Sequence, residues 1–113
     1  LTHLALTVQG FTRIVARIVV LSPLRVALGG GGYDLSNVAR AWTAAWGVMN
    51  GVELGPDLPP AFSDDLRRFG FRSRSLWDPP EPPEPELRRQ AEEYARAQVG
   101  ALRRIVFPVH GLA

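Results

Sequence analysis

The stretch that decides the fold is residues 23–34, which read PLRVALGGGGYD. Residues 26–28 form a continuous apolar run, which is typical of a strand covered on both faces, and we place a strand at about residues 24–28. The four glycines that follow have no Cβ, so their backbone can take positive φ values and lie close to another group. Tyr33 and Asp34 come directly before a segment with helical periodicity. The stretch therefore predicts a strand, a bare-backbone loop and the start of a helix.

The candidate functional residues are the glycines and Tyr33. Four consecutive glycines are costly for a mere turn, since each is destabilising by roughly 0.5–1 kcal/mol relative to alanine in regular structure. Asp34 has the residue type that caps a helix by accepting backbone N–H bonds from its first turn. Tyr33 is then fixed between loop and cap, with its phenol beyond the carboxyl end of the strand, where ligands bind in α/β sheets.

Two other interpretations of the glycine run stay open. The run can be a flexible connector, although its place between a strand and a helix argues against this. It can also be a phosphate-binding loop at a helix N-terminus. No Gly-Lys-Ser/Thr follows, however, and a Gly-x-Gly-x-x-Gly pattern fails at Asp34.

Length and composition limit the class of protein. The 113 residues make one small domain or a piece of a larger one, and 46% hydrophobic residues suffice for a core. A net charge of +2 gives little support for a nucleic-acid partner. Without cysteine there is no disulfide and no thiolate metal site. Neither a signal peptide nor an apolar run of about 20 residues is visible, so we expect a cytoplasmic protein without a membrane partner.

Apolar residues at helical spacing predict three helices, at about residues 9–21, 35–49 and 86–104, and a short helical turn at about 64–69. The expected buried stripes are Phe11, Ile14, Val15, Ile18 and Val19 in the first helix, Leu35, Val38, Trp42, Ala45, Trp46 and Met49 in the second, and Leu87, Ala91, Tyr94, Ala95, Gln98 and Leu102 in the third. Arg40 is interpreted as a structural hydrogen-bond donor, and the run Arg67, Arg68, Arg72 and Arg74 as a solvated surface.

The domain prediction is a single partial domain over residues 1–113, with a Pro-rich connector at residues 78–85. Leu1 is not preceded by a methionine and the opening LTHL reads as mid-chain sequence, so we expect a fragment. One strand cannot satisfy its own hydrogen-bond ladder. Its neighbours must come from chain outside this sequence or from a second copy.

A longer pattern adds a resemblance to a known family. The run GGGGY at residues 29–33, followed by NVARAWT at residues 37–43, resembles the C-terminal part of zinc-dependent histone deacetylases. The bacterial acetoin-utilisation-type deacetylases are the more similar branch. The opening LTHLALT and the segment from Glu53-Leu54 to Leu58-Pro59 share the likeness, which covers about residues 1–70 well and the rest loosely.

The resemblance implies an α/β fold, a three-layer α/β/α domain of which this chain is the final third, mostly helical with one strand. It implies zinc in the parent enzyme. The family's metal ligands and its pair of base histidines lie upstream, and no aspartate or histidine of this chain occupies a ligand position. We therefore expect no metal bound by this fragment alone, and an inactive fragment.

The resemblance also assigns roles within the glycine stretch. Tyr33 is the catalytic tyrosine, and Gly30, Gly31 and Gly32 line the substrate tunnel. A phenol stays protonated at neutral pH and can donate a hydrogen bond to the oxyanion that forms when an amide is attacked. The implied substrates are acetylated lysine side chains of proteins or small acetylated amines.

A second hypothesis belongs to a different class of protein. The chain can be a non-enzymatic interaction domain that self-associates through the apolar faces of the helices at residues 9–21 and 86–104. The open edges of the strand at residues 24–28 would favour such pairing.

Overall fold

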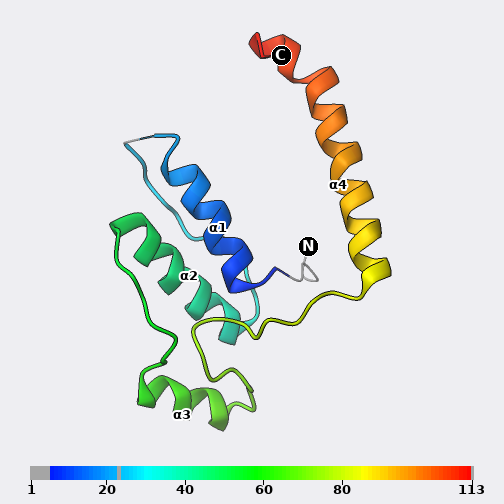
Figure 1. The fold of residues 1–113 in the computed structure, drawn as a ribbon. Coiled ribbons are helices and arrows are strands. Elements are labelled where there is room, and N and C mark those ends of the chain that lie inside the picture. Colours follow the sequence, from blue (N-terminus) through cyan, green and yellow to red (C-terminus); the bar gives the residue numbers. More distant parts are fainter. Residues whose placement is uncertain (1–5, 23, 113) are drawn as a thin grey trace. The chain divides into compact units, whose positions relative to one another are not determined.

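The computed structural model describes residues 6–22 and 24–112. The chain divides into two compact units, Leu1–Pro79 and Pro80–Ala113, and the boundary falls inside the predicted connector. The first unit contains α1 (Val8–Val19), α2 (Leu35–Asn50) and α3 (Pro60–Arg68), and the second contains α4 (Pro85–Ile105) and the 3₁₀ helix η1 (Phe107–His110) (Figure 1). The predicted helices are thus confirmed, and the predicted turn at residues 64–69 is the second half of α3.

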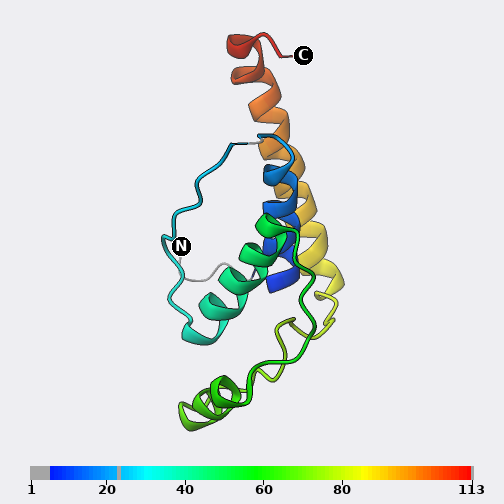
Figure 2. The ribbon, with the colours of Figure 1, turned by 90° about the vertical axis from the view of Figure 1, so that its left-hand side faces the viewer.

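The first unit is built on α1 and α2, which pack against one another (Figure 1). The two helices run in the same general direction, and residues 24–34 lead back from the end of α1 to the start of α2 (Figure 2). Local caps set their ends. The Thr7 side chain accepts the Gly10 N–H, Asp34 accepts the Asn37 N–H, and Gly51 ends α2 in the left-handed region.

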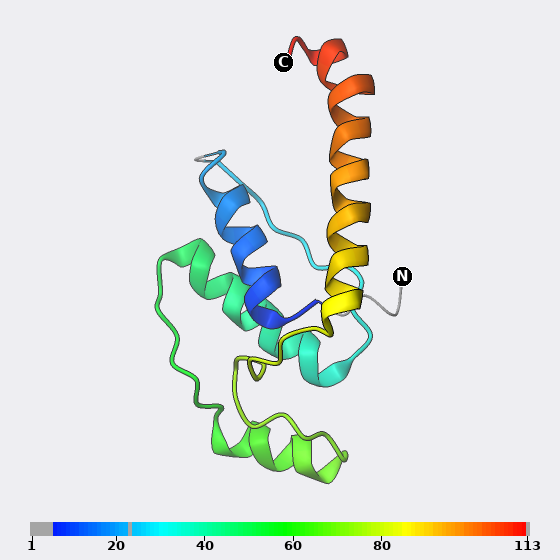
Figure 3. The same cartoon turned by 45° about the vertical axis from the view of Figure 1, so that its right-hand side comes forward.

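The core of the first unit is small and depends on a returning loop. Val8, Ala44 and Leu76 are buried together, and Leu54 and Trp77 are partly buried against them. The loop reaches this place after α3, where the chain runs back beside the first half of α2 (Figure 3). It is fixed there by the Leu76 N–H, which donates to the Pro56 carbonyl at 2.8 Å.

The prediction of a strand at residues 24–28 is wrong. The segment is extended but unpaired, and Leu28 is 88% exposed. Residues 6–22 and 24–112 contain no strand, only an isolated bridge between Asp57 and Ser75. A strand needs a neighbour to take its backbone hydrogen bonds, and the described residues supply none. What they show is a mostly helical chain, without the sheet layer of an α/β/α domain.

The buried stripe predicted for α2 is wrong for half of its six residues. Leu35, Trp42 and Trp46 are exposed, whereas Val38, Ala45 and Met49 are partly buried. The residues that α2 buries fully are Ser36, Arg40, Ala44 and Gly47. Small residues on this face allow close packing. A Cβ at position 47 would lie 2.9 Å from Leu54 Cδ1 and 3.0 Å from the Val52 carbonyl oxygen. Close approach of the backbone, not apolar side-chain size, selects the buried face of this helix.

The stripe predicted for α1 is half right. Phe11, Val15 and Val19 are partly buried, but Ile14 and Ile18 are exposed, and the fully buried positions are Val8 and Thr12. The Thr12 hydroxyl donates to the Val8 carbonyl at 2.6 Å. This bond satisfies the hydroxyl within the helix, so that the side chain can be buried.

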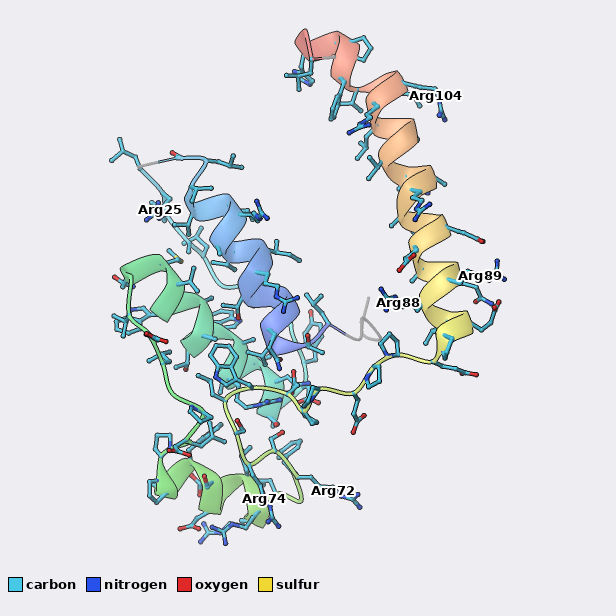
Figure 4. The ribbon with its side chains drawn as sticks, viewed as in Figure 1. Arg25, Arg72, Arg74, Arg88, Arg89 and Arg104 are labelled. Atoms are coloured by element: carbon cyan, nitrogen blue, oxygen red, sulfur yellow. The ribbon has the colours of Figure 1, made fainter. Side chains whose placement is uncertain are left out.

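The second unit is a solvated helix. No residue of α4 is buried, so the stripe predicted for it is exposed in the described chain. Arg89 pairs with Glu86 and Glu93, and Arg88 with Glu92, one turn apart along the helix (Figure 4). The hydrogen bond from Arg89, and then that from Gln90, lower the pKa of Glu86. None of the helices in the described ranges is both long and apolar enough to cross a membrane.

Candidate functional site

The predicted site residues lie in the extended connection that leads into α2. Tyr33 is 79% exposed and directly precedes Asp34, whose carboxylate accepts the Asn37 N–H at 2.9 Å. Gly31 and Gly32 have φ values of 71° and 83°. Residues with a Cβ rarely adopt this left-handed region, so the backbone before Tyr33 depends on glycine.

The four glycines differ in what lies beside them. A Cβ at Gly29 would fall 1.5 Å from the Trp42 ring, and one at Gly32 would fall 2.8 Å from Val38 Cγ2. At Gly30 and Gly31 a Cβ would meet no atom within 4 Å. The run is therefore held against α2 at both ends, while its middle presents bare backbone to open space next to Tyr33.

The polar centre of the first unit is Arg40. Its side chain is 2% exposed, and all five of its N–H groups have acceptors. Nε donates to the Ser36 carbonyl, one terminal nitrogen to the Ser75 and Leu76 carbonyls, and the other to Asn37 Oδ1 and, at 2.7 Å, to Asp78 Oδ1. The prediction that Arg40 is a structural donor is confirmed.

Asp78 connects Arg40 to the start of α1. Its second carboxylate oxygen accepts the Val8 N–H at 2.7 Å. Its backbone forms two bonds with the Gln9 side chain, accepting from Nε2 at 2.6 Å and donating to Oε1 at 3.1 Å. With its side chain 22% exposed, the ion pair is mostly out of water. Removing one partner of such a pair typically costs about 3–5 kcal/mol.

Sequence reasoning did not find Asp78. The residue opens the Pro-rich stretch and reads as part of an extended connector. A signal was present in α2, where Arg40 is the sole charged residue between Leu35 and Asn50. A lone arginine on such a helix needs a carboxylate partner when it is buried, and Asp78 is that partner.

Two hollows of about 320 Å³ each lie in the first unit, and Arg40 and Leu76 line one of them. That hollow is mainly apolar and lies between α2 and the chain around the start of α3, where Thr43, Leu58 and Phe62 contribute to its wall. The other is lined by Ser63, Arg67, Ser73 and Arg74. Tyr33 lines neither of them.

The described residues do not fit a metal. Within residues 6–22 and 24–112 there is no group of three or more His, Cys, Asp or Glu side chains that could hold an ion. His3 lies outside the described residues. The chemistry available in the described residues is that of an exposed phenol beside bare backbone.

Part of the chain is similar to known proteins. It is 35% identical over 65 residues to histone deacetylase clr6 of Schizosaccharomyces pombe, which covers 58% of this chain and 16% of that protein. It is likewise 35% identical over 65 residues to human histone deacetylase 1, with 58% and 13% covered. The similarity is to histone deacetylases.

A bacterial protein matches at the same level. The chain is 36% identical over 66 residues to the acetoin utilization protein AcuC of Bacillus subtilis, with 53% of this chain and 17% of AcuC covered. The matches therefore support the deacetylase family without favouring its acetoin-utilisation branch. The chain spans less than a fifth of the length of these relatives. No protein-family model and no solved structure matches.

Proposed function

We propose that this chain is the C-terminal part of a zinc-dependent deacetylase that removes acetyl groups from lysine side chains, in which Tyr33 steadies the developing oxyanion. The observation that carries the proposal is the setting of Tyr33. An exposed phenol stands between open glycine backbone and a capped helix. The partial similarity to histone deacetylases supports the same reaction.

Deacetylation needs a hydrogen-bond donor close to the carbonyl oxygen of the substrate. Attack on an acetamide carbonyl places negative charge on its oxygen, and a preorganised hydrogen-bond donor lowers the energy of that state. The Tyr33 hydroxyl is such a donor at neutral pH. The bare backbone at Gly30 and Gly31 leaves space in which a long acylated side chain can lie.

The remainder of the site would come from outside this chain. The resemblance implies zinc, which polarises a carbonyl and activates water when bound, and we propose that residues upstream hold it. The same upstream chain would cover the phenol, because a donor of this kind acts most strongly where water is excluded. The isolated chain should therefore lack deacetylase activity.

The test is Tyr33→Phe in the full-length product of the gene that carries this sequence. Removing one donor to an oxyanion typically lowers kcat by roughly 10²–10³, and we expect that loss with an acetyl-lysine peptide. Tyr94→Phe is the matched control, because Tyr94 is the other tyrosine and lies exposed on α4. Equal turnover of the two variants would contradict the proposal.

A second candidate function, self-association, is favoured by the exposed apolar side chains at residues 24–28. Leu24, Val26 and Leu28 point apolar surface to solvent from an extended, unpaired segment, which is a template for pairing with another chain. A self-associating interaction domain would then be the alternative. Sedimentation of the chain tests it, since a dispersed monomer at high concentration contradicts that function.

A further inference from the structure

We propose that Arg40 is a positioning residue for Tyr33, which it fixes through the first turn of α2. The inference rests on the proposed function, because it concerns the hydroxyl that would face the oxyanion. Arg40 itself is buried, with 3% of its surface exposed, and all its N–H groups are used within the chain. What it holds is the short piece of chain from which Tyr33 projects.

The first step of the argument is the set of bonds inside that turn. Asp34 accepts the N–H of Asn37 on its carboxylate and that of Val38 on its carbonyl. Asn37 in turn accepts from Arg40 through its side-chain oxygen. Tyr33 directly precedes Asp34, and two hydrogen bonds connect Asp34 through Asn37 to the Arg40 guanidinium. Tyr33 and Arg40 are only seven positions apart in the sequence.

The second step is the anchor at the other end. Arg40 also binds the Ser75 and Leu76 carbonyls and the Asp78 carboxylate, all on the returning loop. Leu76 belongs to the buried core, and Asp78 also accepts the N–H of Val8, another core residue. The start of α2 is thereby tied to the buried core of the first unit.

A second contact supports the same turn. The hydroxyls of Ser36 and Ser73 are 2.8 Å apart, and the Arg40 Nε donates to the Ser36 carbonyl. Tyr33 itself makes no contact of this kind among the described residues, and its ring is free in solvent. The position of Tyr33 therefore depends on how firmly the first turn of α2 is held.

Lysine cannot take over this task. Arg40 uses five N–H groups that lie in one plane and point to five acceptors, whereas an ammonium group has three donors on a flexible stem. Arg40→Lys keeps the charge for Asp78 but leaves some of the acceptors without a donor. The first turn of α2 then loosens, and a shift of about 1 Å in a catalytic group can cost roughly 10²-fold in rate.

The test is a double-mutant cycle in the full-length protein, with kcat and KM measured on an acetyl-lysine peptide. We expect Arg40→Lys to lower kcat by about 10–100-fold and to leave KM within about threefold. In a Tyr33→Phe background the same change should have little further effect, since the hydroxyl it positions is gone. Arg67→Lys, at an exposed arginine, is the control and should be neutral.

The outcomes separate the two proposals. If Arg40→Lys lowers kcat by the same factor with and without the Tyr33 hydroxyl, Arg40 acts on the fold in general and the positioning role is overturned. An unchanged kcat in Arg40→Lys, beside a large loss in Tyr33→Phe, overturns the positioning role alone. A fully active Tyr33→Phe overturns the proposed function and this inference with it. Should Arg40→Lys fail to fold, Asp78→Asn, which keeps the side-chain shape, takes its place in the cycle.

Discussion

The two faces of α2 differ in burial in the opposite sense to the hydrophobicity of their side chains. One face buries Ser36, Arg40, Ala44 and Gly47, and the other leaves Trp42 and Trp46 exposed, the latter at 56%. On the buried face, small side chains let the backbone approach its neighbours, and the arginine is accepted because every N–H has a partner. On the exposed face, the helix carries large apolar surface that the described residues do not cover.

The difference shows that hydrogen-bond completeness decides which polar group can be buried in so small a core. It also shows that a stripe of large apolar residues marks where a helix can be covered, not where it is covered. In the proposed function, the exposed face of α2 is where the upstream part of the enzyme would pack. Three measurements on this chain test the difference between buried and exposed helix faces.

The largest effect is expected on the buried face. Arg40→Met removes one partner of the buried ion pair, so that Asp78 Oδ1 and three carbonyls lose the donors that Arg40 supplies. The free energy of unfolding should therefore fall by about 3–5 kcal/mol. Arg67→Met removes the exposed pair with Asp64 and should change it by about 0.5 kcal/mol or less. Urea unfolding followed by circular dichroism measures both. Similar losses in the two variants would mean that the buried Arg40 network stabilises the chain no more than an exposed ion pair does.

An intermediate effect is expected where the glycine run meets the exposed face. Gly29→Ala puts a methyl group into the space of the Trp42 ring. Because that indole is partly exposed and can swing outward, we expect a loss of about 1 kcal/mol, the low end for overpacking. A changed near-ultraviolet circular dichroism signal should accompany it.

Gly30→Ala is the matched control for that substitution. No atom lies within 4 Å of the added Cβ, and the φ of Gly30 is not among the positive ones. The free energy of unfolding and the near-ultraviolet circular dichroism of Gly30→Ala should both equal those of the unsubstituted chain. If Gly29→Ala behaves in the same way, the contact between the glycine run and Trp42 does not form in solution.

The smallest effect concerns α4, where no face is buried. Hydrogen bonds from Arg89 and Gln90 lower the pKa of Glu86. These bonds therefore stabilise the helix fully at a pH above the ordinary glutamate pKa. The stabilisation is lost as the pH falls through the lowered pKa of Glu86. The helical circular dichroism of the chain should decline slightly over that acidic window. Glu86→Gln should remove this part of the decline, while Glu81→Gln, outside the helix, should keep it. An unchanged profile in Glu86→Gln would show that these bonds are not formed in solution.

The helices could be predicted from the sequence because their signals are local. Apolar spacing, the Asp34 cap and Gly51 after Asn50 lie within a few residues of the ends they define. The strand at residues 24–28 was not predictable in this way, since an apolar run does not say whether a partner strand is present. The described chain contains none, so the run is extended and solvated.

The candidate site was predictable to the same extent. The place of Tyr33 before a capped helix follows from neighbouring residues, and its catalytic role stays a prediction. The pairing of Arg40 with Asp78 joins residues 38 positions apart, and no local pattern carries such information. Its identification requires the fold of the returning loop, which the periodicity of residues 71–78 does not define.

The complete engagement of the Arg40 guanidinium has a practical consequence for chemical labelling. This chain has thirteen basic residues and no lysine, so reagents selective for guanidinium groups have thirteen targets. Twelve of them should be modified sooner than Arg40, whose nitrogens become accessible only when the loop detaches from α2. The slow appearance of that one adduct, followed by peptide mass spectrometry, would time the opening of the first unit without any substitution or added probe.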